Sequence, residues 1–294
     1  MQIIGKISGI NTSDNMINIL VVDNNNVSYN LKINQEDGKA FVINEVYEFT
    51  VLVKEGERTQ YFIEKYRSIL DFKFEDKNKS LRDFYNSAPV DLVSLEKEID
   101  KYINVIDNKI IKEITKSLID LYHDDYFLYP AATKMHHAYI GGLAYHSTSM
   151  LKLADGVIAA YPYLNKDYVY AGIMLHDIGK IKELSGIVAP EYSTEGQLIG
   201  HLVLGAMEIK MMASKLGYDN TTEAMLLEHM LISHHGMPQF GSAKKPLTAE
   251  ALVLWYVDSI DSKLRTLEGE LDKIEDGEFT QPIGVLDKSK MFKA

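Results

Sequence analysis

Histidine and aspartate are the residues whose placement along this chain points to chemistry. Eight of the nine histidines fall between positions 136 and 235, and an aspartate follows one of them directly. The members that stand in distinctive motifs are His146 in GGLAYH, His176 and Asp177 in LHDIGK, His201 in LIGHL, His234 and His235 in ISHHG, and Asp258 in WYVDS. Because the chain has no cysteine, a bound metal ion must use imidazole and carboxylate, which favours Mn²⁺, Fe²⁺ or a similar octahedral ion over structural zinc.

The spacing of these residues is regular. About 24 to 33 residues separate His146, His176, His201, His234 and Asp258 in turn, which is the length of one helix plus its connection. Successive helices of a bundle could therefore each present a ligand to one common centre. Each motif alone is weak, since a single buried histidine is more often an ordinary core residue, but together they predict a metal site.

Lys180 adds a cation to this set. It lies three and four residues after Asp177 and His176, so a helical turn would place all three side chains on one face. Gly179 between them would allow another backbone to approach closely. The alternative for Lys180 is a surface ion pair with Glu183.

The remaining histidines carry weaker signals. His136 and His137 precede the first ligand-bearing helix and are candidates to contact a phosphate or to support the ligands. His229 is expected in the core or behind the ligands, and His123 in a solvated loop. Asp261, three residues after Asp258, is either a partner of the ligands or a decoy for Asp258.

The first 65 residues have the pattern of a small β-barrel. Five short segments rich in β-branched and aromatic residues are separated by Asn, Asp and Gly: 2–10, 16–23, 26–33, 46–53 and 60–66. Five such strands predict an OB-like barrel, a fold that commonly binds single strands. Tyr29, Tyr61, Phe62 and Tyr66 could stack on bases or could belong to the barrel core.

The rest of the chain reads as helical. Residues 71–93 are polar and aperiodic and predict a linker, and a three- and four-residue apolar period then runs over 95–122, with Ser94 as the expected N-cap. Further helices are expected near 134–160, 167–177, 194–215, 222–234 and 248–274. The predicted organisation is an α+β protein: a barrel over 1–70, a linker over 71–93, an all-helical domain over 94–275 and a tail over 276–294.

Composition excludes several classes of protein. The 294 residues are 46% hydrophobic and carry a net charge of −11, which argues against coating of DNA through many Lys and Arg contacts. The N-terminal segment lacks the features of a signal peptide and no apolar run is long enough for a membrane span, so we expect a cytoplasmic protein. The amphipathic pattern at 94–122 leaves a homo-oligomer open.

The order of the motifs resembles the HD-domain superfamily of metal-dependent phosphohydrolases and, within it, the YhaM-type 3′-to-5′ exoribonucleases. The resemblance rests on PAATKMHHAYIGGLAYHSTSMLKLA (130–154), LHDIGKIKELSG (175–186), EGQLIGHLVLG (195–205), HMLISHHG (229–236) and EALVLWYVDSIDSKL (250–264). It covers nearly all of 80–280. It implies an OB-fold followed by a helical HD domain that degrades single-stranded RNA, and DNA as a further substrate, from the 3′ end.

The resemblance also implies roles for the candidate residues. One divalent ion would be held by His146, His176, Asp177 and Asp258, and a second by His201, His234 and His235, with Asp177 bridging the two. Mn²⁺ is the first expectation for both ions, with Fe²⁺ or Co²⁺ as alternatives. Asp177 and Lys180 would be the catalytic residues, and Lys180, His136 and His137 would bind the scissile phosphate.

Two other functions stay open at this point. HD enzymes that hydrolyse nucleotides or open cyclic dinucleotides carry the same motif from His176 to Lys180, although a small substrate needs no additional β-domain. A non-catalytic single-strand-binding protein with a structural metal site is the second alternative. Seven candidate ligands and a lysine are more than a structural site needs.

Overall fold

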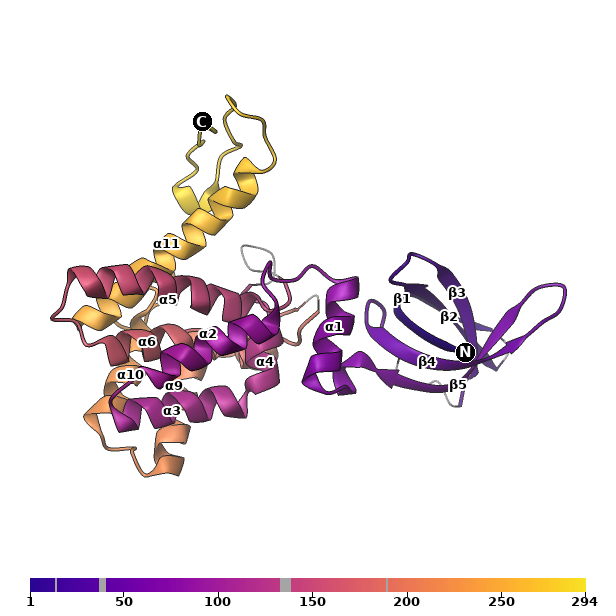
Figure 1. Ribbon diagram of the computed structural model, residues 1–294, viewed down its shortest axis with the longest axis horizontal. Helices are drawn as coiled ribbons and strands as arrows, with labels where there is room; N and C mark the ends of the chain where they lie inside the picture. Colours follow the sequence, from indigo (N-terminus) through magenta and orange to yellow (C-terminus); the bar gives the residue numbers. More distant parts are fainter. Residues whose placement is uncertain (14, 37–40, 133–138, 189) are drawn as a thin grey trace. The chain divides into compact units, whose positions relative to one another are not determined.

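A computed structural model describes residues 1–13, 15–36, 41–132, 139–188 and 190–294 of the chain (Figure 1). The chain forms two compact units, Met1–Asn86 and Ser87–Ala294. The first is built on β-strands and the second on helices, so the predicted fold class, an OB-like barrel followed by a helical domain, is confirmed.

The first unit is a closed five-stranded barrel. Its strands are β1 (Gln2–Ser13), β2 (Met16–Asp23), β3 (Ser28–Asn34), β4 (Val46–Lys54) and β5 (Gln60–Ser68). They are hydrogen-bonded in the order β1-β2-β3-β5-β4, and β1 closes the barrel by pairing with both β2 and β4. A register shift between Ile7 and Gly9 bends β1 so that one strand can serve both neighbours.

Alternation of side chains along the strands fills the barrel. Ile7, Ile19 and Leu31 point inward and are fully buried, as the two-residue period of a strand requires. Of the aromatic residues considered for base stacking, Tyr29 and Tyr61 pack against this core with their rings 5.7 Å apart. They are therefore partly core residues.

The segment predicted as a linker contains a helix. α1 (Phe74–Phe84) follows a short 3-10 turn, η1 (Ile69–Asp71), and α2 already begins at Leu92. The prediction of an aperiodic segment was wrong here because α1 is so polar that its only buried side chains are Lys77 and Leu81. Only Phe74, Leu81 and Phe84 are apolar among its residues, too few to reveal a helical period in the sequence.

The second unit is an all-helical bundle. Its helices are α2 (Leu92–Asn104), α3 (Lys109–Leu121), α4 (His123–Leu128), α5 (Gly142–Ala160), α6 (Lys166–Leu175), α7 (Lys180–Glu183), α8 (Thr194–Leu198), α9 (His201–Leu216), α10 (Thr222–Ser233) and α11 (Ala249–Leu271). Asn165, Ser193 and Thr248 cap α6, α8 and α11 through their side chains. None of the helices that the structure describes combines the length and hydrophobicity needed to span a bilayer.

Two predicted helices are each divided in the structure. The pattern over 95–122 forms α2 and α3, and the chain turns between them at Asn108, whose side chain accepts hydrogen bonds from Ile110 N and Ile111 N. The N-cap of α2 is Asp91 rather than Ser94. The pattern over 194–215 forms α8 and α9, which are separated at Gly200 with a φ of +79°. Both breaks leave the apolar period intact, which explains why periodicity alone did not detect them.

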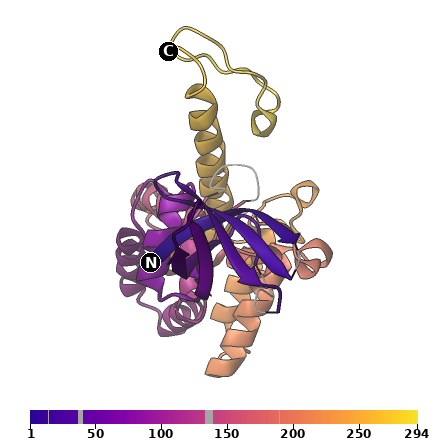
Figure 2. The same cartoon turned by 90° about the vertical axis from the view of Figure 1, so that its right-hand side faces the viewer.

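The segment predicted as a C-terminal tail has structure of its own. α11 extends from the bundle, and the following residues turn back beside it (Figures 1 and 2). They contain the 3-10 turn η3 (Gly284–Leu286) and isolated β-bridges between Phe279 and Phe292 and between Ile283 and Ser289. This part of the chain therefore contributes side chains and backbone to the second unit.

Candidate active site

The bundle brings the seven predicted ligands together at the ends of its helices. His146 lies within α5 and Asp258 within α11, whereas the other ligands lie at helix termini. His176 and His234 are the C-terminal caps of α6 and α10, Asp177 and His235 follow them, and His201 opens α9. Helix ends and the turns next to them thus carry five of the seven ligands. In such a turn, consecutive residues such as His176 and Asp177 can face one centre.

The first group of ligands surrounds one end of this centre. Ligand atoms of His146, His176 and Asp177 all lie within 4.8 Å of one another, and the three residues are buried. Asp258 joins them, because its Oδ1 lies 3.2 Å from Nε2 of His146.

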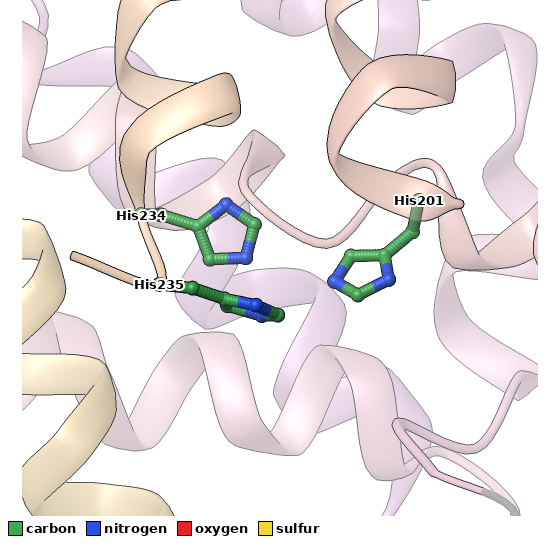
Figure 3. A group of neighbouring side chains, drawn as sticks. All are labelled: His201, His234 and His235. Carbon is green, nitrogen blue, oxygen red and sulfur yellow. The ribbon is translucent and has the colours of Figure 1, made fainter. Parts of the chain in front are cut away.

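The second group consists of three histidines. His201, His234 and His235 each offer a ring nitrogen, and these nitrogens also lie within 4.8 Å of one another (Figure 3). His234 is completely buried, and its ring centroid lies 5.6 Å from that of His201 and 4.5 Å from that of His235. Neutral imidazoles that converge in this way are a common ligand set for transition metal ions.

Asp177 lies between the two groups. Its Oδ2 is 3.2 Å from Nε2 of His176, in the first group. Its Oδ1 faces the second group, at 3.5 Å from Nε2 of His201 and 3.8 Å from Nε2 of His234. One carboxylate therefore reaches both clusters.

A second layer of hydrogen bonds fixes each histidine ring. Nδ1 of His176 and of His234 donates to the carbonyl three residues earlier, Ile173 O at 2.8 Å and Leu231 O at 2.7 Å, both at helix C-termini. The other Nδ1 donors bond to Asp261 Oδ2 (from His146, 2.7 Å), Glu183 Oε1 (from His201, 2.9 Å) and Phe240 O (from His235, 2.9 Å). Because each acceptor takes the proton on Nδ1, the Nε2 atom is the nitrogen of each ring that can offer a lone pair to a ligand.

These residues fit a divalent metal ion. Within the described part of the chain, buried Nε2 atoms of His176, His201 and His234 and Oδ1 of Asp177 have no hydrogen-bond partner. Buried polar atoms are nearly always satisfied in proteins, so a cluster of convergent lone pairs without donors points to cations between them. The HD domain is a metal-dependent phosphohydrolase domain, and the two clusters supply the His and Asp donors that such an ion needs.

Electrostatics keep the cluster ready to bind cations. Burial lowers the pKa of His234 and of His235, and their histidine neighbours lower it further, so both rings are neutral near pH 7. Burial raises the pKa of Asp177, but His176 and Lys180 outweigh this effect and hold the pKa well below its usual value. Burial lowers the pKa of His146, whereas its bonds to Asp258 and Asp261 raise it to about 9 overall, so a cation that binds this ring must displace the proton on Nε2.

Lys180 lies against the first group. Its Nζ donates to Oδ2 of Asp177 at 2.6 Å, instead of forming the ion pair with Glu183 that was the alternative. Burial lowers the pKa of Lys180, and Asp177 more than restores it, so the side chain stays cationic. The preceding Gly179 allows this turn to lie on α9, because a Cβ there would collide with the carbonyl oxygen of His201.

The remaining candidate histidines and Asp261 differ in their roles. Asp261 is a partner of the ligands, since it accepts the bond from His146. His229 has a structural role, because its Nε2 accepts a hydrogen bond from Leu247 N at 3.0 Å. The expectation of a solvated loop for His123 was wrong: it begins α4 and its Nε2 lies 3.0 Å from Glu96 Oε1. His136 and His137 lie outside the described residues.

Sequence reasoning missed several residues around the cluster. Glu183, considered only as a partner of Lys180, is buried and orients His201 through both Nδ1 and the backbone N–H. A pocket of about 430 Å³ adjoins the cluster and is lined by His146, Asp177, Lys180, His235 and Asp258, and by Phe240 and Trp255 among others. Because Glu183 lies three residues after Lys180, the sequence could have indicated that Glu183 belongs to the site. Nothing in the sequence links Phe240 to the site.

The chain is similar in sequence to known proteins. The HD domain family matches residues 143–263. The 3′-5′ exoribonuclease YhaM of Bacillus licheniformis is 40% identical over 219 residues, which cover 74% of this chain and 69% of that protein. The protein of the same name from Geobacillus sp. is 43% identical over 211 residues (72% of this chain, 65% of that protein), and that from Bacillus subtilis is 38% identical over 219 residues (74% and 69%).

Proposed function

Because the chain belongs to the YhaM family of 3′-to-5′ exoribonucleases and carries an HD domain, we propose that it removes nucleotides from the 3′ end of single-stranded RNA by metal-dependent hydrolysis. The observation that carries the proposal is the position of Asp177 between two groups of buried, convergent histidines. The activity belongs in the cytoplasm, where an exoribonuclease meets its substrates.

We assign two divalent ions to the cluster, one for each group of ligands. His146, His176, Asp177 and Asp258 would hold the first, and the three histidines His201, His234 and His235 the second. Mn²⁺ suits this set of imidazole and carboxylate donors, with Fe²⁺ and Co²⁺ as alternatives. When bound, a pair of such ions lowers the pKa of a water molecule and neutralises charge on the phosphate oxygens.

The chain's own residues supply orientation and a further cation. Asp177 can offer one oxygen to each group, since Oδ1 and Oδ2 already face different histidines. Lys180 is only 18% exposed and lines the pocket, so its ammonium can bind a phosphate oxygen where little water competes. The orienting partners Asp261 and Glu183 keep His146 and His201 aimed at the centre.

The barrel is proposed to bind the strand outside the active site. Phe62 is partly exposed on β5, and the ammonium groups of Lys54 and Lys32 lie 4.6 and 6.0 Å from its ring centroid. An aromatic ring with nearby cations is the usual platform for a single strand on an OB-fold. With its proposed boundaries, the chain comprises this barrel over 1–70 and the HD unit over 94–275, joined by the segment that contains α1.

A labelled-strand experiment tests the proposed function. With Mn²⁺, a 5′-labelled single-stranded RNA should shorten in one-nucleotide steps to a ladder, whereas a 3′-labelled strand should release its label at once as a mononucleotide. A matched DNA strand tests the range of substrates. Turnover of a cyclic dinucleotide with no cleavage of RNA would instead support the small-substrate alternative, and metal-independent RNA binding with no hydrolysis would support a binding protein.

Lys180→Gln tests the cation assigned to the phosphate. We expect kcat to fall about 10²- to 10³-fold, the usual effect of removing one charge-stabilising donor, because glutamine is polar but carries no charge. The metal content should stay the same. Lys182→Gln is a matched control, since Lys182 lies two residues away and bonds to Glu208 outside the cluster. Equal activity of the two variants would contradict the role of Lys180.

A further inference from the structure

Part of the pocket beside the histidine cluster is lined by residues that have no role in the proposed hydrolysis. Its volume of about 430 Å³ lies in the range of sites for small molecules and single nucleotide units. Metal ligands and Lys180 form one part of the lining. The other lining residues include two aromatic residues, polar residues of α11 and part of the C-terminal segment: Phe240, Trp255, Ser259, Ser262, Lys263, Val285 and Asp287.

Phe240 is the most unusual member of this wall. Its side chain is 63% exposed although it is a large apolar ring, so burial in a core does not explain its position. The backbone around it is held firmly: Phe240 O accepts from His235 Nδ1, and Phe240 N donates to Met237 O, both at 2.9 Å. The backbone of Phe240 is thereby tied to a proposed metal ligand, and its side chain lines the pocket.

Trp255 is the second aromatic residue that lines the pocket. Its half-buried indole packs on the backbone of Gly236, where a Cβ would collide with the ring and where φ is +78°. It also stacks on Tyr256, with ring centroids 4.9 Å apart and planes 17° from parallel. Gly236 directly follows His235, so the aromatic wall and the second group of ligands form one continuous structure.

Polar side chains of α11 complete the pocket. Ser259, Ser262 and Lys263 follow Asp258 along the helix and line the same space. Hydroxyl and ammonium groups are the usual contacts to sugar and phosphate. An exposed aromatic ring, a polar helix face and a cluster that cleaves phosphodiesters together match the base, sugar and phosphate of one nucleotide.

We propose that this pocket binds the 3′-terminal nucleotide of the substrate and that Phe240 stacks on its base. The proposal rests on the exoribonuclease activity proposed above and adds the residue that positions each nucleotide for cleavage. Stacking on an aromatic ring tolerates every base, which suits an enzyme that must move through any sequence. Phe240 binds substrate in this scheme and takes no part in bond making.

A double-mutant cycle between the ring and the base tests the proposal. The two substrates are a 5′-labelled oligoadenylate and the same strand with a stable abasic ribonucleotide at its 3′ end. In the native protein, kcat/KM for the first cleavage should fall about 5- to 150-fold for the abasic end, as expected for the loss of one stacked base. In Phe240→Ala this difference should largely disappear, because the two partners of the stack are then both absent.

Further variants separate stacking from a structural role. Phe240→Tyr should retain the difference between the two substrates, whereas Phe240→Leu should lose most of it while keeping an apolar side chain and the metal content. Phe279→Ala is the matched control, since Phe279 is 62% exposed and does not line the pocket. It should behave like the native protein.

The outcomes distinguish this proposal from the proposed function. If the native protein degrades RNA but the abasic end has the same effect in Phe240→Ala as in the native protein, the stacking role is wrong and the exoribonuclease function stands. Dependence on the penultimate base in place of the terminal one would overturn the assignment of the pocket. If the native protein cleaves neither strand, the proposed function fails first.

Binding can also be measured without turnover. Trp255 is the chain's single tryptophan and lines the pocket, so its fluorescence reports directly on occupancy. In Asp177→Ala, titration with the oligoadenylate should change the emission of Trp255 with a lower Kd than titration with the abasic strand. Equal affinity for both strands would contradict stacking in this pocket.

Discussion

Asp177→Ala should abolish hydrolysis of RNA, with a loss in kcat of about 10⁴-fold or more. Residues that act as one catalytic unit lose most of their effect when any member is removed, and the two carboxylate oxygens of Asp177 face different histidine groups. A loss of this size corresponds to about 5.4 kcal/mol of transition-state stabilisation. Rates are measured on the 5′-labelled strand under single-turnover conditions.

The same variant should remain folded. The helical circular dichroism of Asp177→Ala should match that of the native protein, because the packing of the bundle depends on its apolar residues. Asp155→Asn serves as the control: Asp155 lies on α5 of the same bundle, and it accepts from the hydroxyls of Tyr102 and Tyr170 away from the cluster. Full activity of Asp177→Ala would overturn the proposed arrangement of two ions around one carboxylate.

Removal of metal should have an effect of similar size. After dialysis against a chelator, hydrolysis should fall to background and return on addition of Mn²⁺, because convergent buried lone pairs cannot hold a phosphate without cations between them. The midpoint of thermal unfolding should also fall, since an ion that binds only the native state stabilises it by about 2.7 kcal/mol at a concentration 100-fold above its Kd. Unchanged stability and activity after complete removal of metal would contradict a metal site here.

Metal analysis of two histidine variants makes this test specific. We expect two ions per native chain and a lower content in His234→Gln, because Nε2 of His234 is one of the buried atoms without a partner. His229→Gln is matched in type and lies on the same helix, but its Nε2 accepts from Leu247 N, so its metal content should stay native. Equal loss of metal in both variants would contradict the assigned second group.

The sequence alone indicated most of the fold and which residues could form the site. Five short strands and a long helical pattern were evident because strand and helix periods are local properties of the chain. The histidine and aspartate motifs were evident because each lies within a few residues of sequence, and their separation by one helix predicted that a bundle would bring them together. The helix α1 was missed because it has few apolar residues, and the breaks at Asn108 and Gly200 were missed because they do not disturb the apolar period.

The tertiary structure decided what faces the site from outside those motifs. Which nitrogen of each ring is free depends on Glu183, Asp261 and three backbone carbonyls, and backbone carbonyls have no signature in a sequence. Phe240 and the C-terminal segment enter the pocket through the path of the chain after α10 and α11. The sequence thus determined the chemistry that the protein can perform, whereas the packing of distant segments, which no local pattern encodes, determined how that chemistry is oriented and enclosed.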